Sequence, residues 1–327
     1  MKIIEVIADH GHRDTIIGIA EQHAVTDWWR GADNDDGRES TRLLVGPANR
    51  QQVLDGLQKA LGVANNVRIM VIPLEAVLPD VRNDDEPGTP SPTREELYTQ
   101  IHRGSRLDLS FLLLVALSTV VAAIGLLEDN VAVIIGAMVI APLLGPNIAL
   151  ALATALADRA MIGSSIRTLA VGLCLATAIA YVIGSVWPNE AQSHELLSRT
   201  QVGLSGAILA LASGAAAILS LTTGVSSILV GVMVAVALLP PAATVGLLLG
   251  QANYELAGGA ALLLAVNVVC VNLAANLIFL LRRIRPRTLP DKQRATRYLF
   301  TAIGVWLLLL AVLIVALDIP TILPVAA

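Results

Sequence analysis

The chain has 327 residues, 55% of them hydrophobic, and a formal net charge of −4. Its mean hydropathy is +0.70, and its apolar share exceeds the roughly 45–50% of ordinary soluble domains. Acidic residues outnumber basic ones by 17 to 10 in positions 1–102, whereas the remainder holds 9 against 12. These values exclude a wholly soluble globular protein and divide the chain into an acidic soluble part followed by a membrane part.

The N-terminal region, residues 1–82, has the pattern of an α+β domain. Strands are expected near residues 3–7, 26–29, 41–45 and 67–72, with a polar hairpin over 31–39 and helices over 14–25 and 49–61. This β-α-β-β-α-β order predicts a ferredoxin-like, ACT-like sandwich. Polar residues such as Asp9 precede any apolar core, so we expect no cleaved signal peptide and a cytoplasmic location for this domain.

Two polar clusters stand out in this domain. Asp9, His10, Gly11 and His12 lie between the first strand and the first helix, where ACT-like domains bind small regulatory ligands. His10 and His12 could also hold one metal, and a polar loop that caps the helix is the plainer interpretation. Positions 33–39 resemble part of a calcium loop without its full spacing, so an Asp-Gly hairpin turn is expected there. We therefore predict a regulatory site at Asp9–His12, no metal site and no cofactor.

A linker and an amphipathic helix are expected over residues 83–108. Positions 84–92 are acidic and proline-rich, and Thr93-Arg94-Glu95-Glu96 has the capping-box pattern of a helix start. Seven apolar segments long enough to span a membrane follow, at about residues 109–127, 131–157, 166–187, 202–221, 227–249, 256–281 and 299–317. Cys174 and Cys270 lie inside these segments and are interpreted as buried small side chains.

The distribution of charge between the spans predicts their orientation. Basic residues precede the first span (Arg103, Arg106), separate the second from the third (Arg159, Arg167) and fill a loop at 282–298. The opposite side carries Glu128, Asp129, Glu190, Glu195 and Glu255, with Arg199 the exception. We expect a multi-pass protein of the plasma (inner) membrane, with the N-terminal domain and the 282–298 loop in the cytoplasm and the C-terminus outside. That loop could be a nucleic-acid patch, but topology and contact with anionic lipid account for it, so no nucleic-acid partner is expected.

The second span contains the segment Gly136-Ala-Met-Val-Ile-Ala-Pro-Leu-Leu-Gly-Pro146. A similar segment, Gly231-Val-Met-Val-Ala-Val-Ala-Leu-Leu-Pro-Pro241, follows about 95 residues later. Proline removes a helical hydrogen bond and clashes with the preceding turn, so both spans are predicted to be broken helices. Residues 109–187 and 203–281 would then be two three-span repeats. Because three spans reverse the direction of the chain, the second repeat should be inverted relative to the first.

Each predicted break leaves a half-helix, 147–157 after Pro146 and 242–249 after Pro241. Their first amide groups would favour an anion, whereas the carbonyl groups before each break could bind a cation. The alternative is that proline and glycine only permit kinked close packing.

The sixth span adds three asparagines, of which Asn276 shares a face with Asn272 while Asn267 is turned away. Uncharged amides equally serve as links between helices. The predicted solute- or ion-binding residues are Pro142, Gly145, Pro146, Asn147, Pro240, Pro241, Asn267, Asn272 and Asn276.

The segment Gly136–Pro146, followed by Asp158, resembles the signature of the bacterial and archaeal family called domain of unknown function 389. The resemblance covers about residues 109–281 and departs at Ala141, where the family commonly has serine. It implies an integral membrane protein of unassigned activity and supplies no site residues.

We expect a membrane transporter or channel for a small solute or ion, with a cytoplasmic regulatory domain. It is not expected to be an enzyme, because no His-Glu-x-x-His, Gly-x-Ser-x-Gly or P-loop pattern occurs. The alternative is an oligomeric receptor or scaffold whose membrane part anchors a ligand-sensing domain without transport. Either protein contacts the lipid bilayer, and abundant Gly and Ala on the spans favour a homo-oligomer.

Overall fold

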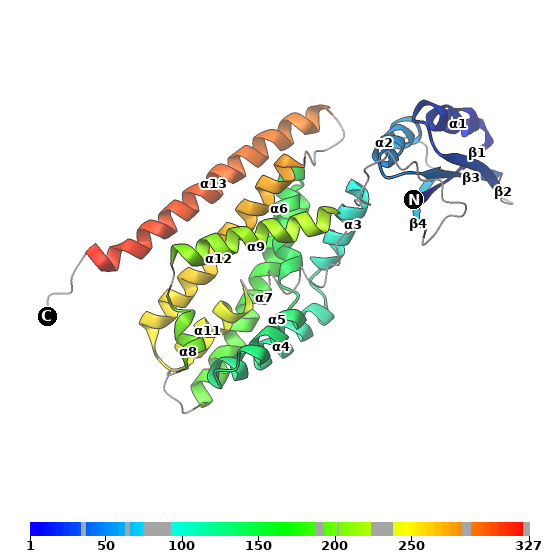
Figure 1. Ribbon diagram of the computed structural model, residues 1–327. Helices are drawn as coiled ribbons and strands as arrows, with labels where there is room; N and C mark the ends of the chain where they lie inside the picture. Colours follow the sequence, from blue (N-terminus) through cyan, green and yellow to red (C-terminus); the bar gives the residue numbers. More distant parts are fainter. Residues whose placement is uncertain are drawn as a thin grey trace. The chain divides into compact units, whose positions relative to one another are not determined.

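The computed structural model describes residues 1–33, 37–62, 66–74, 93–187, 193–201, 203–223, 238–282 and 289–322. The chain divides into two compact units, Met1–Arg94 and Glu95–Ala327 (Figure 1). The predicted amphipathic helix therefore belongs almost entirely to the second unit, and the predicted linker at 84–92 lies outside the described residues.

The first unit is a small α+β domain. It consists of β1 (Lys2–Asp9), the 3-10 helix η1 (His10–His12), α1 (Arg13–Gln22), β2 (Asp27–Asp33), β3 (Arg38–Val45), α2 (Arg50–Leu61) and β4 (Arg68–Pro73). The strands form one antiparallel sheet in the order β2-β3-β1-β4. The element order is the predicted one, and the strand order is that of a ferredoxin-like sandwich.

Alternate residues of the strands build the core of this unit. Ile4 and Val6 of β1 are fully buried and pack with Ile16 of α1 and with Leu54 and Leu57 of α2. Side chains alternate between the two faces of a strand, so this face of the sheet is covered by the helices.

Three local details of this unit differ from the sequence prediction. Strands β2 and β3 extend to Asp33 and Arg38, so residues 31–33 and 38–39 of the predicted hairpin are strand, and Asp33 pairs with Glu39. Helix α1 ends at Gln22 rather than at residue 25, because Ala24 adopts the left-handed conformation with a φ of 47°. Asn49 occupies the N-cap position of α2, but its side chain donates to the carbonyl oxygen of His23 at 3.1 Å instead of capping.

The second unit is helical throughout its described residues. It consists of α3 (Arg94–Gly104), α4 (Leu109–Leu127), α5 (Val131–Ile140), α6 (Leu144–Leu156), α7 (Arg159–Val186), α8 (His194–Ser198), α9 (Leu204–Thr223), α11 (Leu239–Gly250), α12 (Tyr254–Leu281) and α13 (Leu289–Ile322). Helices α4, α7, α9 and α12 are long and apolar enough to cross a membrane, and α5 with α6 forms an apolar pair bent by 52°. The chain is therefore that of a helical membrane protein.

Not all seven predicted spans are represented among the described residues. Five of them coincide with α4, the α5–α6 pair, α7, α9 and α12. Residues 227–237 of the span expected at 227–249 lie outside the described part of the chain, and α11 is its described end. The span expected at 299–317 falls in α13, whose apolar part, Arg297–Leu313, is shorter than the other spanning helices.

Helix boundaries recur at a constant spacing of 95 residues. Helix α4 starts at Leu109 and α9 at Leu204, α6 at Leu144 and α11 at Leu239, and α7 at Arg159 and α12 at Tyr254. The turns after α6 and α11 also match, because Ala157 and Ala252 have left-handed φ values of 57° and 58°. The hydrogen bonds from Asp158 N to Ala153 O and from Asn253 N to Leu248 O are both 2.9 Å long. The local structure therefore repeats along with the sequence.

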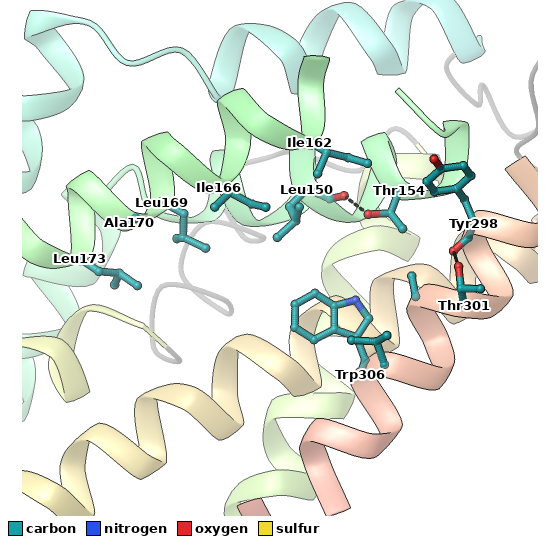
Figure 2. Close-up of a pocket in the computed structure, with 12 residues that line it drawn as sticks. Leu150, Thr154, Ile162, Ile166, Leu169, Ala170, Leu173, Tyr298, Thr301 and Trp306 are labelled. Atoms are coloured by element: carbon teal, nitrogen blue, oxygen red, sulfur yellow. Dashed lines mark hydrogen bonds between the residues drawn. The ribbon is translucent and has the colours of Figure 1, made fainter. Parts of the chain in front are cut away.

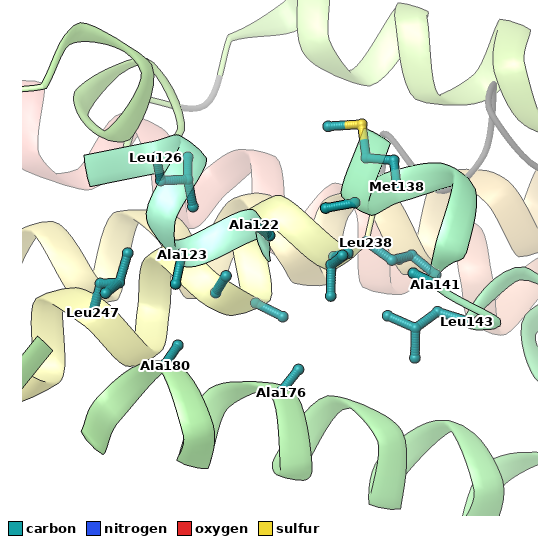
Figure 3. Close-up of a cluster of buried hydrophobic side chains, with 14 of the residues drawn as sticks. Ala122, Ala123, Leu126, Met138, Ala141, Leu143, Ala176, Ala180, Leu238 and Leu247 are labelled. Carbon is teal, nitrogen blue, oxygen red and sulfur yellow. The ribbon is translucent and has the colours of Figure 1, made fainter. Parts of the chain in front are cut away.

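Small residues allow the helices of this unit to pack closely. One buried core joins α4, α5, α7 and α11, with Ala176 and Ala180 of α7 facing Leu238 and Leu247 at α11 (Figure 3). Close backbone contact of this kind is usual between membrane helices.

The two short helices α6 and α11 run in opposite directions along α7. A Cβ atom on Gly246 of α11 would overlap the carbonyl oxygen of Thr177, and one on Gly250 that of Tyr181, so α11 is parallel to α7. In contrast, Leu143 before α6 packs against Gly172 in the middle of α7, and the end of α6 turns directly into the start of α7. Helix α6 is therefore antiparallel to α7.

Candidate functional site

The break predicted at Pro142–Pro146 is present, and it lies at residues 141–143, around Pro142 rather than Pro146. Helix α5 ends at Ile140 and α6 begins at Leu144. Ala141, the residue before Pro142, has a ψ of 121°, as expected because proline disfavours helical geometry in its predecessor. Pro146 lies in the first turn of α6, where no partner for its nitrogen is needed. The prediction that the half-helix starts at Asn147 is therefore wrong.

The first turn of α11 differs from the prediction in the same way. The helix begins at Leu239, with Pro240 and Pro241 as its next residues. Ala242 was expected to carry a free amide, but its nitrogen donates to the carbonyl oxygen of Leu238 at 3.2 Å. Because the two prolines have no N–H, only Leu239 offers one among the first three residues of α11. An anion site built from free helical amides is accordingly weaker than predicted.

Gly145 has a close-packing role in this structure. It lies in the first turn of α6 against Gly104 at the end of α3, and a Cβ atom on Gly145 would overlap the carbonyl oxygen of Gly104. Helices α3 and α6 are held together again at the other end of α6, where Tyr98 donates to the side chain of Asp158 at 3.0 Å. Burial, followed by this bond to Asp158, raises the pKa of Tyr98. Helix α3 is therefore part of the membrane unit.

Two of the predicted asparagines form a direct contact between α6 and α12. Asn272 Nδ2 donates to Asn147 Oδ1 at 2.5 Å and to the carbonyl oxygen of Val268 at 2.9 Å. Asn276, one turn further along α12, is fully buried like the other two. Within the described residues, four atoms of this amide cluster have no hydrogen-bond partner: Asn147 Nδ2, Asn272 Oδ1, Asn276 Nδ2 and Asn276 Oδ1. Buried amides in this state favour a further hydrogen-bonding partner.

The same contact has a counterpart on the other pair of helices. Thr177 Oγ1 of α7 donates to the carbonyl oxygen of Ala242 of α11 at 3.4 Å. Thr177 and Ala242 lie 95 residues from Asn272 and Asn147, respectively. Each short helix thus contacts the long helix of the other repeat through equivalent positions.

A polar cavity of about 350 Å³ lies between α8, α9, α11 and α12. Its lining includes the predicted residues Pro241 and Asn267 together with Ser213 of α9, and Glu195 and Arg199 lie at its α8 end. Glu195 and Arg199 form an ion pair with an oxygen–nitrogen distance of 2.5 Å. Asn267 therefore lines a different place from Asn272 and Asn276, in agreement with its predicted direction on α12.

The connection from α4 to α5 is hydrogen-bonded to α8 at the Glu195 end of this cavity. The side chain of Asp129 accepts hydrogen bonds from the backbone nitrogen of Glu195 at 2.6 Å and from Ser193 Oγ at 3.0 Å. These bonds, the backbone one first, lower the pKa of Asp129. The sequence predicts an outer-surface turn at Asp129, with an ion or proton site as the alternative.

A second cavity, of about 550 Å³, lies between α6, α7 and α13 and is apolar (Figure 2). Leucine and isoleucine side chains line one wall, and Trp306 and Tyr298 of α13 line the other. The hydroxyl groups of Thr154 and Thr301 donate to carbonyl oxygens of their own helices, those of Leu150 and Tyr298. This cavity offers no spare threonine donor to a polar solute.

In the first unit, the predicted regulatory loop contacts a buried carboxylate that belongs to the predicted hairpin. His10 Nδ1 lies 3.0 Å from Oε2 of Glu39, a residue that is only 2% exposed. Arg30 and Arg13 lie 3.1 Å and 3.6 Å from the same carboxylate. Asp9, Gly11 and His12 make no such contact among the residues described. No group of three metal-ligating side chains occurs in the described residues either.

Comparison with known proteins places these helices in a family. The family model described as domain of unknown function (DUF389) matches residues 138–273, a range that includes the first break, Asn147 and Asn272. An uncharacterized protein of Methanocaldococcus jannaschii is 33% identical over 311 residues, covering 94% of this chain and 96% of the relative. No solved structure matches the chain. With a relative of this identity along nearly its whole length, the chain belongs to the domain of unknown function 389 family.

Proposed function

We propose that the protein is a membrane transporter or channel for a small solute or ion, with a cytoplasmic regulatory domain at its N-terminus. The observation that carries the proposal is the polar cavity between α8, α9, α11 and α12. The side chains of Asn267 and Ser213 line this cavity together with Pro241, which lies in the first turn of α11. A helix that starts at membrane depth is tolerated where it lines a cavity or is buried in protein.

The directions of the two short helices support the inverted repeat that we propose for this protein. Helices α6 and α11 occupy equivalent places 95 residues apart, yet α11 is parallel to α7 and α6 is antiparallel to it. The reciprocal contacts, Asn147 with Asn272 and Ala242 with Thr177, are those expected of a two-fold relationship between the repeats. Transporters built from inverted repeats place their substrate between such broken helices.

The chemistry of the buried residues favours a solute that forms hydrogen bonds. Asn147, Asn272 and Asn276 offer amide donors and acceptors without a formal charge. Glu195 and Arg199 line the polar cavity at its α8 end, where the two charges form an ion pair with each other. We therefore favour a small solute or ion recognised by amide and backbone groups over one that needs a full counter-charge.

The proposed orientation places the arginine-bearing ends in the cytoplasm. Arg106 of the α3–α4 connection lines the same pocket as Arg159 and Arg167 of α7, so these three arginines belong to the same end of the unit. The opposite end carries the contact of Asp129 with α8. An excess of arginine on one side favours the cytoplasm for that side, and the plasma (inner) membrane is the proposed location.

Flux through the purified full-length protein tests this function. The protein would be reconstituted into liposomes and assayed with a panel of monovalent ions and small neutral solutes. We expect flux of at least one class, and a marked reduction in Asn267→Ala and Asn272→Ala. Asn253→Ala is the matched control, since Asn253 caps α12 without a side-chain capping bond.

Absence of flux for every solute would contradict the proposal. An oligomeric receptor or scaffold, in which the membrane unit only anchors the first unit, would then be the better assignment. Size-exclusion chromatography with light scattering would measure the proposed homo-oligomer in either case.

A further inference from the structure

A basic pocket of about 740 Å³ lies where the connection from α3 to α4 meets the first turns of α7. Three arginines line it: Arg106 from the connection, and Arg159 and Arg167 from α7. His102 lines it as well, and the carboxylate among its lining residues belongs to Asp108. The pocket is separate from the polar cavity at Pro241 and from the asparagine cluster.

The positive charge of this pocket is not neutralised by its own residues. Arg106 and Arg167 form no ion pair or hydrogen bond within the described part of the chain. The guanidinium group of Arg159 donates to the hydroxyl of Tyr298 at 2.9 Å and faces the ring of the same residue, and it forms no ion pair among the described residues. The carboxylate of Asp108 accepts from the backbone nitrogen of Phe111 at 2.7 Å and thereby caps α4. Three guanidinium groups thus face one carboxylate.

The pocket lies at the level where long apolar surfaces begin. Arg106 precedes α4, whose first residue, Leu109, is 71% exposed. Arg167 is followed by a stretch of α7 without a charged residue as far as Val186. Ile166, beside Arg167, is 51% exposed. In a membrane protein, exposed apolar side chains of this kind face acyl chains, so the arginines lie at the height of lipid headgroups.

We propose that this pocket binds the phosphate group of an anionic phospholipid. Arginine matches phosphate oxygens with paired N–H donors, which makes guanidinium clusters suited to this group. A soluble phosphate compound has the same chemistry, but the exposed apolar surfaces beside Arg106 and Arg167 favour a ligand with acyl chains. This site is independent of the proposed transport.

The test is a binding titration on the delipidated full-length protein in a neutral detergent, followed by native mass spectrometry. Phosphatidylglycerol, phosphatidylcholine and inorganic phosphate are titrated separately. We expect preferential binding of phosphatidylglycerol, weakened by about a hundredfold in Arg106→Gln/Arg167→Gln, because each of the two lost charge-assisted contacts is worth about one decade in affinity. Arg103→Gln is the matched control, because Arg103 precedes the pocket on α3 and does not line it.

Further outcomes decide between lipid, soluble anion and diffuse charge. Binding of inorganic phosphate that the double variant loses, without a preference between the two lipids, would overturn the lipid assignment. An equal loss in Arg103→Gln would overturn the pocket in favour of general surface charge. If the glutamine variant fails to fold, Arg106→Lys/Arg167→Lys keeps the charge but loses the paired donors. If this lysine variant binds phosphatidylglycerol as tightly as the wild type, the proposal that paired guanidinium donors recognise the phosphate group is wrong.

Discussion

Asn272 of α12 donates a hydrogen bond of 2.5 Å to Asn147 of α6 inside the membrane unit. At the equivalent contact of the other repeat, Thr177 and a backbone carbonyl group perform the same joining role. The packing of a short helix on a long one therefore does not require a pair of amides. This asymmetry favours a role for the asparagines beyond linking the two helices.

Separating stability from transport tests that role. Asn147→Ala should destabilise the protein by about 1–2 kcal/mol, because Asn272 Nδ2 keeps its bond to Val268 but loses the one to Asn147 in a non-aqueous interior. Thermal unfolding of the detergent-solubilised protein measures this loss, and flux in liposomes should fall in parallel.

The double variant Asn147→Leu/Asn272→Leu provides the control. Replacing both partners by apolar side chains of similar size leaves no unpaired amide at either position, so the unfolding temperature should return close to the wild-type value. Flux should remain low. A double variant that regains both stability and flux would show that the asparagines only link helices.

The prolines at the first break are predicted to act together. Pro146→Ala alone should leave the break in place, because Pro142 still interrupts the helix after Ile140. Pro142→Ala/Pro146→Ala removes both prolines, each of which would destabilise a helix interior by about 3 kcal/mol. The double variant should therefore favour one continuous helix. We expect the double variant to lose most of the flux and Pro146→Ala to retain most of it. Equal loss in both would assign Pro146 a direct role.

The stability of the first unit should depend on pH through Glu5. Hydrogen bonds from Ser40 at 2.7 Å and Arg42 at 2.8 Å, the former the larger effect, lower the pKa of this carboxyl group from 4.5. Because the folded-state pKa is depressed, the stabilisation is complete above about 4.5 and is lost as the pH falls through the folded value. Thermal unfolding of a fragment of residues 1–94 from about pH 7 down to about pH 3, a window that includes the ordinary pKa of about 4.5 for this carboxyl group, should show this loss. Glu5→Gln should flatten the profile, and an unchanged profile would exclude Glu5 as its cause.

Local sequence patterns predicted the elements and much of the repeat. The spacing between the Gly136 and Gly231 segments is the spacing that separates the helix starts of α6 and α11. Helical periodicity also placed Asn272 and Asn267 on different faces of α12, and the two contact different parts of the unit. Such features depend on neighbours within a few turns, which a single sequence contains.

Contacts between distant segments could not be predicted in this way. A proline marks the end of one helix or the first turn of the next, and its sequence position alone does not distinguish the two. The packing of Gly145 on Gly104 and the contact of His10 with Glu39 depend on how elements meet in space. For the same reason, Arg106 and Arg167 were interpreted as topology signals, and the pocket that they share was missed.

The glycines of α11 give the most direct test of how the two repeats pack. A Cβ atom on Gly246 would overlap backbone atoms of Thr177 and Tyr181 and the side chain of Ala180, so α7 and α11 would have to move apart. Gly246→Ala should therefore destabilise the protein by about 1–3 kcal/mol through overpacking.

Gly258→Ala is the matched control on α12, because a Cβ atom there has no neighbour within 4 Å among the described residues. That variant should be neutral or more stable by up to about 1 kcal/mol, the intrinsic preference of a helix for alanine. Thermal unfolding of both variants in the same detergent measures the difference. Equal stability of the two would contradict the close contact between α7 and α11.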